Sequence, residues 1–170
     1  SNLAYSPNSF TLTKGTQMTT VTPTANGGTI VSYSVSPSLP AGLSLDTSTG
    51  AISGTPTAVT SSASYTITAT NTGGSDTASV TIVVNDVIPS DLDYSPNSFT
   101  LTKGTQMTTV TPTANGGTIT GWSVSPSLPA GLSLDSTTGA ISGTPTAVTS
   151  SATYTITATN TGGSDTATVT

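Results

Sequence analysis

The chain has 170 residues, a formal net charge of −5 and only two basic side chains, Lys14 and Lys103. Two lysines cannot form the positive patch that neutralises phosphates, so we expect no nucleic-acid partner. No apolar run approaches the roughly 20 residues that span a bilayer, so we expect no membrane insertion by this chain. Because the sequence contains no cysteine, no disulfide can stabilise the fold.

The composition predicts strands. Thr and Ser dominate, and β-branched residues such as Thr, Val and Ile favour strands because they pack well on a pleated surface. The apolar residues alternate with polar ones and do not recur at helical spacing. We therefore predict an all-β protein.

Two near-copies of one unit follow each other at an offset of 89 residues. Residues 5–81 match residues 94–170 except at seven positions, which in the first copy are Val31, Ser32, Tyr33, Thr47, Ser48, Ser64 and Ser79. Such near-identity indicates a tandem duplication, and a unit of about 85–90 residues has the size of one β-sandwich domain. We predict a first domain at 1–86, a short linker at 87–89 and a second domain at 90–170.

Each copy shows the pattern of a β-sandwich, with short strands and turn signals about every ten residues. In the first copy we expect strands at 3–5, 10–12, 18–24, 30–36, 43–45, 51–53, 63–70 and 76–85. Val31, Tyr33 and Val35 should share one face, and Tyr33 becomes Trp122 in the second copy, as suits an aromatic core residue. In the last two strands the inward residues should be Tyr65, Ile67, Ala69, Ala78, Val80, Ile82 and Val84.

The most distinctive stretch, Leu39–Thr57, recurs as Leu128–Thr146 and predicts a β-hairpin. Asp46 can accept hydrogen bonds from the backbone just ahead of it, and Gly50 can adopt a positive φ that reverses the chain. Pro56 has no N–H to donate and should end the pairing.

The last strand of the second copy is shorter than that of the first. The sequence ends at Thr170, whereas the first copy continues with Ile82-Val83-Val84-Asn85. Loss of two buried aliphatic side chains would cost about 1.5–3 kcal/mol each. We therefore expect the natural protein to continue as a longer array.

The stretch Leu-Pro-Ala-Gly-Leu-Ser-Leu-Asp-x-x-Thr-Gly-Ala-Ile-Ser-Gly-Thr-Pro-Thr, with the later run Tyr-Thr-Ile-Thr-Ala-Thr-Asn, resembles the putative-Ig (cadherin-like) repeat of bacterial and archaeal surface proteins. The resemblance covers about 26–84 and 115–169. It implies two tandem Ig-like antiparallel β-sandwich domains of a secreted or cell-surface protein, often an adhesin or an accessory module of an extracellular enzyme. It brings no active site with it.

Three of the seven aspartates gather at the domain junction: Asp86, Asp91 and Asp93. Calcium takes six to eight oxygen ligands, which these carboxylates, Asn85 and backbone carbonyls could supply. A calcium ion would stiffen the linker, as in cadherins, although the acidic motifs with Glu that cadherins place in the preceding domain are missing. The alternative is a solvated, charged linker. No other cofactor is expected.

Two other groups of side chains have alternative interpretations. Lys14 and Lys103 could form an intramolecular isopeptide bond to Asn, but a Lys followed by Gly in a turn favours a solvated side chain. Threonine ladders could bind ice or sugar, or could simply favour strands; they are Thr20/Thr22/Thr24, Thr66/Thr68/Thr70 and Thr155/Thr157/Thr159. No exposed pair of aromatic residues predicts a platform for sugar stacking.

Catalysis is not expected, because a chain without His, Cys, Glu or Arg cannot assemble a nucleophile, a base and an orienting group. We predict a non-enzymatic structural repeat of an extracellular or cell-surface protein: a stalk, spacer or filament subunit, or part of an adhesin. Its expected partners are neighbouring copies that pair through exposed edge strands. The alternative is a carbohydrate-binding or spacer module of a secreted polysaccharide-degrading enzyme.

Overall fold

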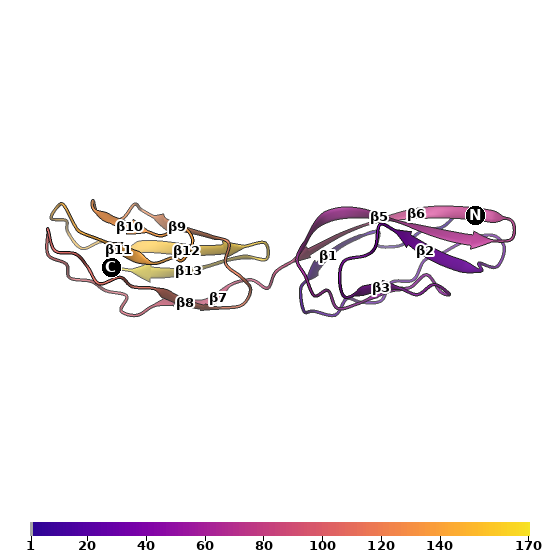
Figure 1. Ribbon diagram of the computed structural model, residues 1–170, viewed down its shortest axis with the longest axis horizontal. Helices are drawn as coiled ribbons and strands as arrows, with labels where there is room; N and C mark the ends of the chain where they lie inside the picture. Colours follow the sequence, from indigo (N-terminus) through magenta and orange to yellow (C-terminus); the bar gives the residue numbers. More distant parts are fainter. Residues whose placement is uncertain (1) are drawn as a thin grey trace. The chain divides into compact units, whose positions relative to one another are not determined.

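The computed structural model describes residues 2–170 and divides the chain into two compact units, Ser1–Asp86 and Val87–Thr170 (Figure 1). Among the described residues every regular element is a β-strand, as the composition predicts. None of these residues belongs to a helix long and apolar enough to cross a membrane.

Unit 1 has one four-stranded sheet and a short hairpin. Its strands are β1 (Ser9–Thr13), β2 (Ser32–Ser36), β3 (Leu43–Leu45), β4 (Ile52–Gly54), β5 (Thr60–Asn71) and β6 (Gly74–Asn85). The sheet has the order β1-β6-β5-β2, and β3 pairs with β4 on the other side of the unit (Figure 1). All pairs are antiparallel except β1 with β6, which run in the same direction. The first strand therefore adds a parallel edge to a sandwich that is otherwise antiparallel.

The core of unit 1 lies between these two layers. The alternation predicted for the last two strands is confirmed, because Tyr65, Ile67, Val80, Ile82 and Val84 are 0–4% exposed. Ile52 of β4 is fully buried from the opposite layer, and the leucines of β3 pack against the same cluster.

Unit 2 repeats this plan with a smaller sheet. Its strands are β7 (Ser90–Tyr94), β8 (Pro112–Asn115), β9 (Gly121–Ser125), β10 (Leu132–Leu134), β11 (Ile141–Gly143), β12 (Tyr154–Asn160) and β13 (Gly163–Val169). One sheet has the order β13-β12-β9, and β10-β11 and β7-β8 are two-stranded. Tyr94, Ile141, Ile156 and Val169 form the centre of the core.

Three expectations about individual strands are wrong. Residues 3–5 form no regular strand, and Ala4 makes only an isolated bridge. Residues 18–24 form no regular strand: Val21 makes an isolated bridge with Ile52, and Thr24 makes one with Ala4. Pro23 lies between these bridges and has no N–H for a continuous ladder. Val31 is 68% exposed and lies outside the core, because β2 begins only at the next residue and the alternation does not extend back to it.

The predicted hairpin is confirmed in both units, and its glycines are required by packing. Gly50 and Gly139 have φ values of 73° and 71°. A Cβ at Gly139 would lie 2.7 Å from ring carbons of Trp122, and a Cβ at Gly50 would lie 2.7 Å from the Tyr33 ring. The core aromatic residue of each unit therefore packs directly against the backbone of the hairpin turn.

We expect Gly139→Ala to destabilise unit 2 by about 2–4 kcal/mol, because it combines a strained φ with a clash against Trp122. Gly104→Ala is the matched control: Gly104 has a similar φ of 80° and nothing within 4 Å of its added Cβ, so only the backbone strain remains. Trp122 is the only tryptophan, so its fluorescence during denaturation reports unit 2. Equal destabilisation by both substitutions would contradict the packing argument.

Candidate functional site

The aspartates of the hairpin turns are bound to the backbone. Asp46 Oδ1 accepts hydrogen bonds from the N–H groups of Ser48 and Thr49 at 2.8 and 2.9 Å, and Asp135 makes the equivalent bonds. The bond from Thr49 and then that from Ser48 lower the pKa of Asp46, because both favour the charged carboxylate. These carboxylates cap turns, as predicted.

A second pair of aspartates holds the beginning of each unit. Asp76 Oδ2 accepts a hydrogen bond from the Leu3 N–H at 2.9 Å, and Asp165 Oδ2 accepts one from Leu92 at the same distance. Each of these carboxylates therefore joins the start of its unit to the last strand, across 73 residues of sequence.

The junction aspartates predicted as calcium ligands have protein partners. Asp86 is buried, and its Oδ1 lies 3.7 Å from the Lys14 Nζ. Asp91 Oδ2 accepts a hydrogen bond from the Asn115 side chain at 3.1 Å, whereas Asp93 is exposed. In residues 2–170 no three acidic side chains form a group suited to a metal ion. Calcium binding stays a prediction, and through Asp86 it would require the contact with Lys14 to open.

The same ion pair bears on the isopeptide interpretation. The Lys14 side chain is 42% exposed, and its Nζ lies 3.7 Å from the Asp86 Oδ1. The lysine is therefore less solvated than its position before a turn glycine suggests, and its charge lies beside a buried carboxylate.

The predicted linker 87–89 packs within unit 2. The Val87 carbonyl accepts hydrogen bonds from the Gly117 N–H at 3.0 Å and from the Asn160 side chain at 2.7 Å. Ile88 covers Gly163 so closely that a Cβ there would lie 2.6 Å from the isoleucine Cδ1. These residues therefore belong to the second unit and close its loop end.

A buried tyrosine in each unit, which the sequence analysis did not single out, ties the beginning of the unit to the hairpin turn. The Tyr5 hydroxyl donates to the Gly50 carbonyl, and the Tyr94 hydroxyl donates to the Gly139 carbonyl, both at 2.6 Å. Burial raises the pKa of each tyrosine to about 12 because the phenolate would lose its hydration. The signal that could have found them is a tyrosine at the same place in both copies.

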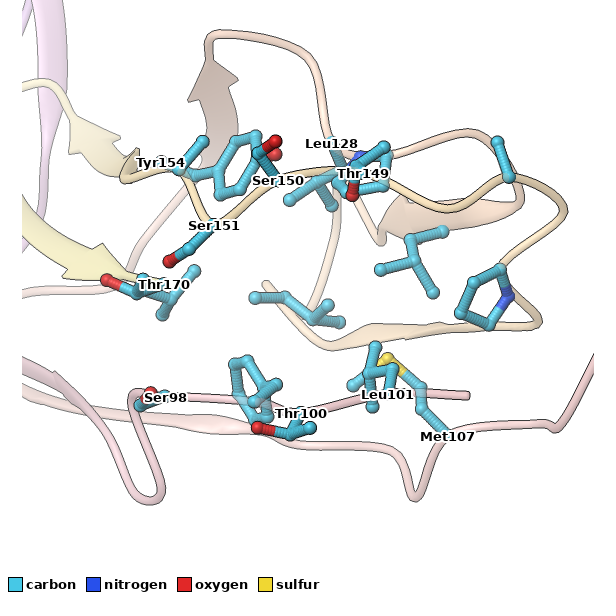
Figure 2. A pocket seen from close by; sticks show the side chains of 18 of the residues that line it. Ser98, Thr100, Leu101, Met107, Leu128, Thr149, Ser150, Ser151, Tyr154 and Thr170 are labelled. Carbon is cyan, nitrogen blue, oxygen red and sulfur yellow. The ribbon is translucent and has the colours of Figure 1, made fainter. Parts of the chain in front are cut away.

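A groove of about 350 Å³ lies in unit 2 (Figure 2). Its apolar lining includes Phe99, Leu101, Met107, Leu128 and Tyr154. Figure 2 shows Ser98, Thr100 and Leu101 on one side, Thr149 to Ser151 on the other, and Thr170 at one end between them. The polar lining of the groove consists of serine and threonine side chains and Lys103.

Tyr94→Phe should lower the free energy of unfolding of unit 2 by about 1–3 kcal/mol, because it leaves the buried Gly139 carbonyl without its donor. The wild-type unit should also lose stability as the pH rises from 10 towards 12: the unfolded tyrosine ionises near 10.0, while the folded one stays protonated to about 12. Denaturation followed by Trp122 fluorescence measures both effects.

Tyr5→Phe is the matched control, since it removes the same bond from unit 1 and should leave the Trp122 transition unchanged. A Tyr94→Phe variant with wild-type stability and the same loss above pH 10 would contradict this role.

The comparisons with known proteins agree with this architecture. The family model described as "Putative Ig domain" matches twice, over residues 1–85 and 88–170. None of the curated proteins compared with the chain matches it.

Two solved structures share the fold. Drosophila OTK, extracellular domains 3–5, aligns with a TM-score of 0.55 and 18% identity, covering 99% of this chain and 60% of that one. The N-terminal eight Ig domains of Down Syndrome Cell Adhesion Molecule isoform 1.30.30 align with a TM-score of 0.54 and 14% identity, covering 95% of this chain and 21% of that one. The chain thus spans less than two thirds of either, and at these identities the likeness shows the fold alone. The chain belongs to the Putative Ig domain family, and each half of it is one Ig-like β-sandwich repeat.

Proposed function

We propose that the chain is a non-enzymatic structural repeat of an extracellular protein, a spacer or stalk segment in which Ig-like units follow one another. The observation that carries the proposal is the duplication itself: two consecutive units have nearly the same sequence, and each has its own core. Repetition of one small domain adds length, whereas a single catalytic or binding site does not require it.

The chemistry of the side chains supports a structural role. Asp46, Asp76, Asp135 and Asp165 accept hydrogen bonds from backbone N–H groups, and Asp86 faces Lys14. In the described residues no buried side-chain N or O atom lacks a hydrogen-bond partner. Polar groups used in this way stabilise turns and strand ends.

The fold relatives support an extracellular setting. The OTK domains are extracellular, and the Down Syndrome molecule is a cell adhesion molecule whose N-terminal part has eight Ig domains. A surface rich in hydroxyls with only two lysines also suits exposure outside the cell, because it offers few sites to proteases that cut after basic residues. Within this proposal we include two more specific roles: the protein takes part in adhesion, and copies of it pair through their edge strands.

A spacer requires units that unfold independently, and a matched pair of core substitutions tests this. Ile156→Ala creates a cavity in unit 2, and Ile67→Ala creates the equivalent cavity in unit 1; both isoleucines are 0% exposed. Each should cost its own unit about 2–5 kcal/mol. We expect only Ile156→Ala to shift the Trp122 fluorescence transition. A shift of equal size from Ile67→Ala would mean that the two units unfold as one and would contradict independence.

The location is tested on the cells that produce the protein. Antibodies raised against the 170-residue chain should label intact cells or their shed material in immunogold electron microscopy, and permeabilisation should add little signal. Labelling confined to the cell interior would overturn the proposal. In a parallel experiment the purified chain should not be retained on insoluble polysaccharide, and retention would favour the carbohydrate-binding alternative.

A further inference from the structure

The first and last strands of unit 1 lie side by side and run in the same direction. In β1 the residues Ser9–Thr13 pair with Thr81–Asn85, the second half of β6, over five consecutive positions. The contact extends beyond the ladder, because the Thr81 N–H donates a hydrogen bond to the Asn8 carbonyl at 2.8 Å. One parallel ladder therefore joins the two ends of the unit.

The parallel direction decides how a pull on the chain loads this ladder. The chain enters β1 at the end where Ser9 lies opposite Thr81, and it leaves β6 at the other end of the ladder, after Asn85. A pull through the chain therefore acts along the strands and in opposite senses on the two of them. All the hydrogen bonds of the ladder share such a load, whereas a pull on both strands from the same end breaks the bonds one after another. Because a single hydrogen bond contributes little to stability, the shared arrangement resists the larger force.

Side chains of both strands shield the ladder from water. Ile82 and Val84 of β6 are 0% exposed, and Phe10 and Leu12 of β1 pack against the same core cluster. The other edge of β6 is paired with β5, so both edges of this strand are held. Hydrogen bonds are electrostatically stronger in surroundings of low dielectric constant. To slide β1 along β6, a pull must therefore break the backbone bonds and the apolar contacts together.

Further contacts hold the chain where it approaches and leaves the ladder. The Asp76 carboxylate, near the start of β6, accepts a hydrogen bond from the Leu3 N–H at 2.9 Å. At the other end the Lys14 N–H donates to the Asn85 carbonyl at 2.9 Å. Asp86 is buried there, and its Oδ1 lies 3.7 Å from the Lys14 Nζ. The two strands are thus tied to each other before the ladder begins and after it ends.

We propose that unit 1 bears tension along the chain and that the parallel ladder of β1 and β6 is the element that resists it. A pull on unit 2 reaches this ladder through the peptide bond between Asp86 and Val87. The inference goes beyond the proposed spacer role, because a spacer requires only length and can be mechanically weak.

Single-molecule pulling with handles at chosen positions tests the direction of the load. The chain has no cysteine, so two introduced cysteines define where the force acts. Asn8→Cys with Val87→Cys places the handles at opposite ends of the ladder, and Thr16→Cys with Val87→Cys, the matched control, places them at the same end. All three positions are exposed. At every pulling speed the first pair should unfold unit 1 at the higher force. An equal or lower force for the first pair overturns the proposal.

Two core substitutions in the first handle variant separate the ladder from general stability. Ile82→Ala and Ile67→Ala each remove a 0% exposed isoleucine side chain, but only Ile82 lies in the ladder with β1. Ile82→Ala should lower the unfolding force more than Ile67→Ala does, and an equal loss of force overturns the proposal. If a core variant fails to fold, the comparison of handle positions still decides, since it needs no core substitution. An intracellular location of the protein would overturn the spacer role and leave these forces unchanged.

Discussion

The burial of Ile82 and Val84 between β1 and β5 is the interaction on which the arrangement of unit 1 depends. Through these two residues β6 pairs with β1 on one side and with the beginning of β5, at Thr60, on the other. The Asn85 carbonyl then accepts a hydrogen bond from the Lys14 N–H at 2.9 Å, and Asp86 faces the same lysine side chain. One short aliphatic segment therefore joins the edge strand β1 to β5 and organises the end of the unit.

The stretch Leu39–Thr57, which recurs in unit 2, is constrained by the close approach of backbone segments to one another. A Cβ on Gly54 would lie 2.2 Å from the Gly42 carbonyl oxygen, and one on Gly50 would clash with the Tyr33 ring. Asp46 holds the turn between the strands by accepting two backbone hydrogen bonds. The substitutions within the stretch are confined to positions 47 and 48, which are exposed, as expected where packing constrains the other positions.

Aspartates are most of the few charged side chains in this chain, and most of them make contacts that stabilise the fold. Those of the hairpin turns cap the backbone, and Asp76 and Asp165 hold the first residues of each unit through 2.9 Å bonds to Leu3 and Leu92. A protein with so few charges and so many hydroxyls obtains its stability from buried aliphatic residues and satisfied backbone groups. This is consistent with a spacer, in which each unit needs stability more than reactivity.

The sequence by itself determined the all-β class, the duplication, the hairpin and the inward residues of the last two strands, because alternation, turn residues and repetition are local signals. It could not determine which strand pairs with which, so the parallel pair of β1 and β6 and the Tyr94–Gly139 bond appear only in the folded chain. The physical reason is that a strand is stabilised by its neighbours, and only tertiary structure supplies or withholds the neighbour.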